Sequence, residues 1–169
     1  MKTLSLSPFS GFLQIAYVTT DVDEAIARFA AEHNVPAWAR LPGIEIESLG
    51  GRHCKLNIAL AFVGPTQLEL IEPLSGDDGI YRDALPGTGF AIRHHHIAQL
   101  IESEAAFEAQ REEMAARGVP IVVDGQSPGA ARYFYTDHRA MLGHYIEHIW
   151  YTPAGLAAMK HVPRNGAVR

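Results

Sequence analysis

One phrase, a short strand-like run followed directly by a helix-like run, occurs twice in this sequence and constrains the fold more than any other feature. The first copy covers residues 12–30 and the second covers residues 91–117. In each copy, β-forming residues give way to a side chain that can cap a helix, Thr20 or Asp21 in the first and Ser103 in the second. Apolar residues at helical spacing follow. Two similar modules are therefore expected.

Three further strand-like runs follow each helix, so each half predicts the order β-α-β-β-β and the chain an α+β fold. The predicted runs are 37–46, 56–63 and 67–72 in the first half and 120–123, 130–135 and 142–151 in the second. We divide the chain into a first module (12–73), a linker (74–90), a second module (91–151) and a C-terminal extension (152–169). Glycine, proline and aspartate dominate the linker, which has one candidate helical turn at 80–84. A short helix is expected at 154–160, followed by a frayed tail.

The two modules share a register that places polar side chains at equivalent positions. Gln14 stands seven positions before Asp21, and His96 stands seven positions before Ser103. A glutamate follows in the last strand of each module, 55 positions on in the first (14 to 69) and 51 in the second (96 to 147). Together these strands supply one imidazole, one amide oxygen and two carboxylates. This donor set suits a divalent cation, with room for water or substrate.

The sequence Arg93-His94-His95-His96 looks like a metal cluster in itself, but strand geometry argues against that interpretation. Neighbouring residues of a strand point to opposite faces. Alternation therefore predicts that His94 points with His96 and that His95 faces away. One histidine of the three, His96, is expected to be a ligand.

Composition excludes several functional classes. The net charge is −5 and no basic block occurs, which argues against a nucleic-acid surface. No apolar run approaches the roughly 18 residues that span a bilayer, and the first residues lack the apolar region of a secretory signal, so we expect a cytoplasmic protein without membrane contact. Cys54 is the one cysteine, so no disulfide forms within the chain, and it is interpreted as a packed residue.

Four segments in this order and spacing resemble the vicinal oxygen chelate superfamily, which includes glyoxalase I, methylmalonyl-CoA epimerase, extradiol dioxygenases and bleomycin resistance proteins. The segments are LQIAYVTTDVDEAIARF, PTQLELIEP, HHHIAQLIESEAAFEAQREEMAARGVPI and GHYIEHIWY. The resemblance implies two paired βαβββ modules that form a half-open, barrel-like sheet centred on a metal. It also implies a homodimer, and leaves open whether the modules pair within one chain or across the dimer.

By position, the resemblance places the metal ligands at Gln14, Glu69, His96 and Glu147. It implies one divalent ion per site, with Zn first and Ni, Co, Mn or Fe as alternatives. Glu147 is the expected general base, and Glu69 is either a ligand or the acid/base on the opposite face. The Gln-Glu-His-Glu set is most similar to that of the glyoxalase I branch with a glutamine as first ligand, whereas the Leu-Ile-Glu-Pro ending at residues 70–73 resembles the epimerase branch, which usually has histidine first.

The expected function is that of a metal-dependent lyase or isomerase that transfers a proton next to a carbonyl of a small molecule. Glutathione-dependent glyoxalases carry arginine and asparagine where this chain has Val18 and Pro73, so glutathione is not predicted as a substrate. Two alternatives stay open. One is an Fe(II) ring-cleaving dioxygenase, and the other is a non-catalytic member of the superfamily that binds a small ligand.

Overall fold

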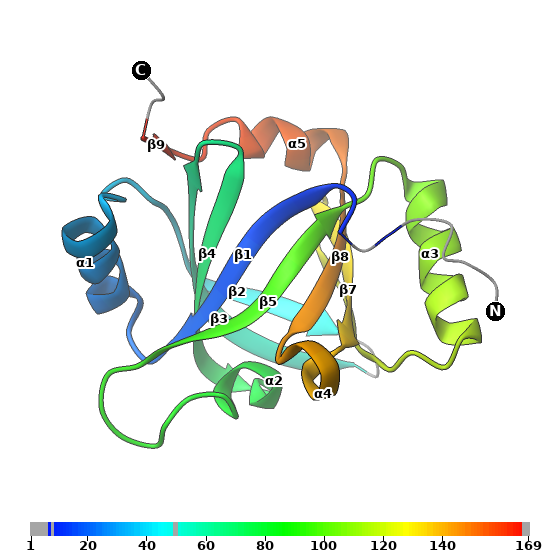
Figure 1. Ribbon diagram of the computed structural model, residues 1–169, viewed down its shortest axis with the longest axis horizontal. Coiled ribbons are helices and arrows are strands. Elements are labelled where there is room, and N and C mark those ends of the chain that lie inside the picture. The colour runs from blue at the N-terminus through cyan, green and yellow to red at the C-terminus, as the bar shows by residue number, and fades with distance from the viewer. Residues whose placement is uncertain (1–6, 8, 49–50, 167–169) are drawn as a thin grey trace.

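The computed structural model describes residues 7, 9–48 and 51–166 (Figure 1). Each half contains one long helix and four strands in the predicted order. The elements of the first half are β1 (Phe12–Thr19), α1 (Val22–His33), β2 (Ala39–Ser48), β3 (Arg52–Val63) and β4 (Thr66–Gly76). The elements of the second half are β5 (Ile92–Leu100), α3 (Glu104–Ala116), β6 (Ile121–Ser127), β7 (Ala131–Asp137) and β8 (Tyr145–Tyr151).

Both long helices begin where the sequence predicts. The Asp21 side chain accepts hydrogen bonds from the backbone N–H groups of Asp23 and Glu24 at the start of α1. The Ser103 side chain accepts one from the backbone N–H of Ala106 at the start of α3. Such caps satisfy donors that the first turn of a helix leaves free.

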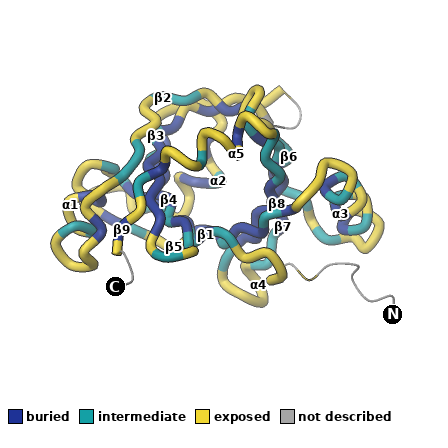
Figure 2. Tube along the Cα trace, turned by 90° about the horizontal axis from the view of Figure 1, so that it is seen from above, coloured by how far each residue is buried: buried dark blue, intermediate teal, exposed yellow. Residues whose placement is uncertain are grey.

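The strands form one closed ring, in the order β2-β6-β7-β8-β5-β1-β4-β3 and back to β2 (Figure 2). The two modules meet within this one chain, along the antiparallel pair β1–β5 and at β2–β6. The predicted α+β class and barrel-like sheet are confirmed. The barrel closes further than the half-open form that was expected, although the β2–β6 seam has only two residue pairs, Glu47–Gln126 and Ser48–Gly125.

The long helices cover the outside of the barrel and leave its interior to side chains from the strands (Figures 1 and 2). Alanine and isoleucine of α1 pack on Ala59 and Leu70, and Phe107 and Met114 of α3 pack near Phe134. The largest apolar cluster lies inside the ring and contains residues from both modules. A barrel filled in this way can hold a site that both modules build.

Short helices occupy the ends of the ring. They are α2 (Gly79–Arg82), α4 (Arg139–Leu142) and α5 (Pro153–Met159). Figure 1 shows α2 and α5 at opposite ends of the barrel. The turn predicted in the linker corresponds to α2, and the helix predicted in the extension corresponds to α5.

Several predicted segments differ in the structure: β3 begins at Arg52 instead of 56, β4 extends to Gly76 instead of 72, and β6 extends to Ser127 instead of 123. The last strand of the second module was expected from residue 142 but begins at Tyr145, because 139–142 form α4 and Gly143 ends that helix with φ of 80°. Part of the predicted frayed tail is ordered, since β9 (Arg164–Asn165) pairs in parallel with β3. The predictions for residues 1–6, 8 and 167–169 lie outside the described residues.

Across the described part of the chain, no helix combines the length and apolar character that crossing a bilayer requires.

Candidate metal centre

The four side chains singled out in the sequence meet inside the barrel, on four consecutive strands (β4, β1, β5 and β8). They converge on the Nε2 atom of His96, which is fully buried. This atom lies 3.2 Å from Oε1 of Gln14, 3.5 Å from Oε2 of Glu69 and 3.4 Å from Oε2 of Glu147. The structure thus brings together all four residues, from both modules.

Two alanines separate these side chains within the sheet. Ala16 stands between His96 and Glu69 in the strand register, and Ala98 stands between Gln14 and Glu147. Both alanines are buried. Their methyl groups leave the middle of the cluster free of larger side chains, so the four polar groups can face one centre.

Hydrogen bonding fixes which nitrogen of His96 carries a proton. Nε2 of His95 lies 2.9 Å from the backbone carbonyl oxygen of Ile80, which can only accept, so His95 donates there. A neutral His95 then has its lone pair on Nδ1, which lies 2.9 Å from Nδ1 of His96. His96 must donate through Nδ1, and its Nε2 lone pair is left facing the three oxygens.

Gln14 is oriented in a similar way. Its Nε2 donates to Oε1 of Gln67 at 2.8 Å, which leaves its own Oε1 pointing at His96. Four acceptor atoms therefore face one another in a buried site, and none of them brings a proton to share. Such an arrangement requires a cation, or protonation of a carboxylate.

The residues fit a divalent ion in both chemistry and spacing. Metal–ligand bonds of about 2.1 Å would hold neighbouring donors about 3.0 to 3.4 Å apart, which is close to the 3.2 to 3.5 Å separations around Nε2 of His96. Within the described residues, no three His, Cys, Asp or Glu side chains are placed so that they could hold a metal ion by themselves, so the amide oxygen of Gln14 is needed as a donor.

The electrostatics of the cluster reflect burial without a countercharge. Burial, followed by the charge of Glu147, raises the pKa of the Glu69 carboxyl well above its usual range. Burial raises the pKa of Glu147 to about 8, although a hydrogen bond from Tyr135 partly lowers it. Burial, with smaller contributions from His94 and His144, lowers the pKa of His96 to about 3. A neutral imidazole beside two carboxyls of raised pKa is ready to exchange protons for a metal ion.

The triple histidine departs from the expected alternation. His94 pairs with Tyr17 and His96 pairs with Ala16, so His95 is the extra residue of a β-bulge. His95 therefore points inward, where its ring lies against Tyr81 and Tyr145, whereas His94 contacts Tyr17 and His144. The prediction that His95 faces away and His94 points with His96 is wrong.

Sequence reasoning did not identify two residues that support the cluster. Gln67 holds the Gln14 amide, and His95 fixes the tautomer of His96. Gln67 lies two positions before Glu69 on the same strand, so its face could have been inferred from the period of two. His95 could not, because nothing in the local sequence marks the bulge.

A cavity of about 320 Å³ leads from this cluster to solvent. Its wall includes two carboxyl and two tyrosine side chains, from Glu69, Glu147, Tyr133 and Tyr135. Exposed members of the lining mark its mouth, and these are Leu41, Glu45, Ser127 and Ala158. A small molecule can reach the two glutamates through this opening.

Enlarging Ala98 is expected to prevent metal binding without unfolding the barrel. Ala98→Val adds two methyl groups between Gln14 and Glu147, at a cost to stability of about 1 to 3 kcal/mol. Metal content of the purified variant, measured beside its thermal unfolding, checks the prediction. Ala61→Val, at a buried position in β3, is the matched control for overpacking. A normal metal content in Ala98→Val would contradict the assignment of the centre.

The comparisons with known proteins agree with this architecture. Residues 13–136 match the family model described as "Glyoxalase/Bleomycin resistance protein/Dioxygenase superfamily". No curated protein matches the sequence.

Several solved structures share the fold. Methylmalonyl-CoA epimerase from Mycobacterium tuberculosis is 20% identical with a TM-score of 0.61, and the match covers 92% of this chain and 97% of that one. A variant methylmalonyl-CoA epimerase from Streptomyces coelicolor, in complex with 2-nitronate-propionyl-CoA, is 16% identical with a TM-score of 0.58, covering 84% and 94%. A hypothetical protein from Bacillus halodurans is 19% identical with a TM-score of 0.54, covering 83% and 94%.

Proposed function

Because the chain belongs to the glyoxalase/bleomycin resistance protein/dioxygenase superfamily, we propose that it is a metal-dependent isomerase or lyase that moves a proton next to a carbonyl of a small molecule. The observation that carries the proposal is the meeting of four acceptor atoms, from Gln14, Glu69, His96 and Glu147, around one buried point. The fold shared with methylmalonyl-CoA epimerases supports the isomerase side of the proposal.

The four residues would hold one divalent ion, with zinc as the first choice. When bound, such an ion acts as a Lewis acid towards a substrate oxygen and stabilises negative charge that develops there. His96 binds through Nε2, because its Nδ1 donates to His95. Gln14 binds through Oε1, because its amide nitrogen is held by Gln67.

Glu147 is the proposed general base, which would be a loose ligand or leave the ion as substrate binds, and would then take the proton from the carbon next to the carbonyl. Tyr135 donates a hydrogen bond to its carboxyl, and the carboxyl reaches the wall of the cavity where substrate would lie. Glu69 enters the same cavity from β4, with β1 and β5 between the two glutamates. Two carboxyls on separated strands support removal of a proton by one and its return by the other, as epimerisation needs.

The donor set favours this chemistry over ring cleavage by Fe(II). The dioxygenase site uses two histidines and one carboxylate. In the structure the second inward histidine, His95, is engaged through both ring nitrogens, by Ile80 and His96. A cluster with one available imidazole and two carboxyls suits a Lewis acid better than that triad.

Metal content and proton exchange test the proposal together. The purified protein is expected to hold about one divalent ion per chain, and chelation is expected to abolish exchange of substrate α-protons in heavy water. NMR follows this exchange over a panel of α-hydroxy carbonyl compounds and acyl-CoA thioesters, with buffer and chelated protein as controls. Absence of a metal ion, together with ligand binding but no exchange, would favour the non-catalytic binding alternative. Oxygen consumption on a catechol with Fe(II) would favour the dioxygenase.

The homodimer expected from the resemblance stays a prediction. The ligand cluster is assembled within one chain, so a second copy is not needed to complete it. Sedimentation of the purified protein checks the oligomeric state.

A further inference from the structure

The seam between β2 and β6 is the weakest join in the ring of strands. Within the described residues it has two pairs, Glu47–Gln126 and Ser48–Gly125, whereas every other pair of neighbours in the ring has five or more. Both Glu47 and Gln126 are exposed, so water competes for the backbone hydrogen bonds that join the strands there. A short pairing at the surface is where a folded protein opens at the lowest free-energy cost.

The β2–β3 hairpin carries a hinge beside this seam. Strand β3 shifts its register against β4 between Lys55 and Leu56, and beyond that shift two described pairs hold the end of the hairpin to β4. Within the hairpin, residues 44–48 of β2 stay paired with β3. The end of the hairpin (44–48 and 52–55) can therefore move as one flap, because few pairs join it to the neighbouring strands on either side.

A glycine lets the flap close onto β6. A Cβ atom at Gly125 would lie 3.0 Å from the backbone carbonyl oxygen of Glu47 on β2 and 2.9 Å from the ring of Tyr133 on β7. A glycine inside a strand often marks such a close approach of another backbone. The seam therefore closes beside the Tyr133 ring only because residue 125 has no side chain.

The closed seam leaves one polar atom without a partner. The hydroxyl of Tyr133 is buried and makes no hydrogen bond. The ring carbon that carries this hydroxyl would lie 3.0 Å from a Cβ atom at Gly125, which places the hydroxyl at the seam. A buried hydroxyl without a partner costs the hydrogen bond that it made with water. Separation of β2 from β6 would hydrate the hydroxyl, and this gain offsets part of the strand pairing that is lost.

The seam also borders the barrel cavity. Residues of β2 (Leu41, Ile44, Glu45 and Ile46) and Ser127 at the end of β6 lie in the cavity wall. Leu41, Glu45 and Ser127 are exposed and mark the mouth. Movement of β2 away from β6 therefore widens the mouth that the closed structure already has.

We propose that the seam between β2 and β6 opens in the folded protein, by movement of the flap, and acts as a gate to the barrel cavity. In the closed state the mouth leads to a cavity of about 320 Å³. In the open state the mouth is wider, so compounds larger than the closed mouth reach the cavity wall. This inference goes beyond the proposed function and needs no metal ion.

Two engineered disulfides test the gate, both in a Cys54→Ala background that leaves no other thiol. Glu47→Cys/Gln126→Cys places a cross-link across the seam, where directly opposed residues of antiparallel strands lie within disulfide range. Val63→Cys/Thr66→Cys places one between β3 and β4, away from the seam, and is the matched control. Each full-length variant is compared in its oxidised and reduced forms.

Hydrogen exchange read by mass spectrometry measures the opening itself. In peptides that cover residues 44–48 and 121–127, the seam disulfide is expected to slow exchange by about tenfold, because it removes the local opening. The control disulfide and both reduced variants are expected to exchange like the Cys54→Ala parent. Gly125→Ala is expected to act in the opposite direction and speed exchange, because its Cβ atom displaces Glu47 or Tyr133. Gly87→Ala, where a Cβ atom meets open space, is the control for this change.

Nitration by tetranitromethane measures whether a small molecule passes the gate. The reagent attacks a phenolate, and burial raises the pKa of Tyr133, so this ring reacts only when the seam is open. The seam disulfide is expected to slow nitration of Tyr133 by about tenfold, and reduction is expected to restore it. Tyr17, whose ring lies outside the barrel against Phe29, is the internal standard.

Equal exchange and equal nitration in the oxidised and reduced seam variants would overturn the gate. Slower exchange with unchanged nitration would overturn it too, because the seam would then open without admitting the reagent. These outcomes are distinct from those of the proposed function. A chain that shows the gate but holds no metal ion keeps this inference and loses the function, and a metal-binding chain whose seam stays closed does the reverse.

Discussion

Replacing Glu147 with glutamine is expected to lower the rate of α-proton exchange by about a thousandfold while the fold is retained. The amide is close to the carboxyl in size but cannot take a proton at neutral pH, and a positioned general base contributes roughly a hundredfold to ten-thousandfold to such reactions. The same change is expected to raise the thermal stability of the metal-free protein at pH 7 to 8. Burial holds the pKa of Glu147 at about 8, so its ionisation opposes folding, whereas a neutral amide has no such cost.

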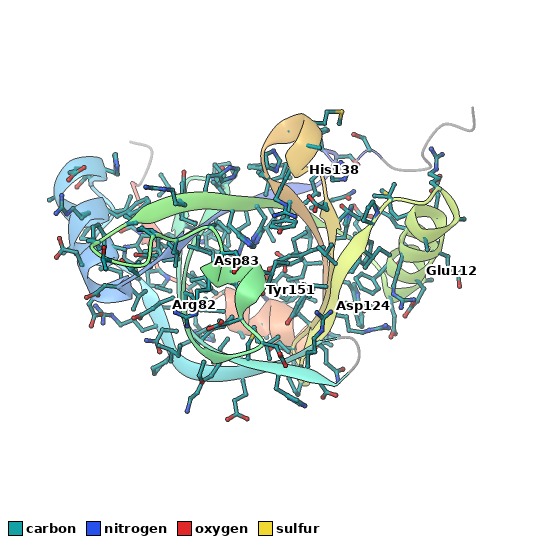
Figure 3. All side chains as sticks on the ribbon, turned by 90° about the horizontal axis from the view of Figure 1, so that it is seen from below. Arg82, Asp83, Glu112, Asp124, His138 and Tyr151 are labelled. Atoms are coloured by element: carbon teal, nitrogen blue, oxygen red, sulfur yellow. The ribbon has the colours of Figure 1, made fainter. Side chains whose placement is uncertain are left out.

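The experiment therefore measures two opposite effects of Glu147→Gln, a loss of exchange activity and a gain in the stability of the metal-free protein. Exchange is followed by NMR in the metal-loaded protein, and unfolding is followed by circular dichroism after chelation. Glu112→Gln is the matched control, because Glu112 is exposed on α3, far from the barrel interior (Figure 3). Full exchange activity in Glu147→Gln would remove Glu147 from the role of base. A metal-free variant less stable than the wild type would contradict the electrostatic account of the site.

The metal-free protein is expected to be most stable near pH 6.5 and to lose stability on both sides. Burial lowers the pKa values of His95, His96 and His148 to about 3, below the ordinary 6.5. As the pH falls below 6.5, these histidines bind protons in the unfolded chain but stay neutral in the folded chain, so the free energy of unfolding falls towards pH 3. Burial raises the pKa of Glu147 from 4.5 to about 8, so between these values the unfolded chain gives up a proton that the folded chain keeps, and stability falls as the pH rises.

Between pH 4.5 and 6.5 the two effects oppose each other, and below pH 4.5 the effect of Glu147 no longer opposes that of the buried histidines. The slope there is expected to approach about 4 kcal/mol per pH unit, because three protons contribute about 1.4 kcal/mol each. Urea unfolding in the presence of a chelator, from pH 4 to 9, measures this slope. His148→Gln should reduce it by about a third whatever its effect on overall stability, and exposed His33→Gln is the control. A free energy of unfolding that is flat from pH 6.5 to 4 would contradict the prediction.

Much of the fold could be predicted because its signals are local and occur twice. Alternating strand residues, the capping side chains of Asp21 and Ser103, and the equal spacing from Gln14 and His96 all survive in the structure. What could not be predicted depends on contacts between distant segments. The bulge at His95 arises where β5 pairs with β1, and the barrel closes where β2 meets β6. Neither pairing leaves a mark in the residues themselves.

The linker between the two modules affects the protonation of His96, which lies in the second module. A carbonyl at Ile80, in the first turn of α2, decides through His95 which ring nitrogen of His96 is free. Arg82 ties that turn to the end of β4, with Nη2 2.9 Å from the carbonyl oxygen of Pro73. The segment that connects the two modules therefore helps to set the geometry of a site that both modules build. A change in α2 that removed the Ile80 carbonyl from His95 would therefore free the tautomer of His96, a side chain that Ile80 itself does not contact.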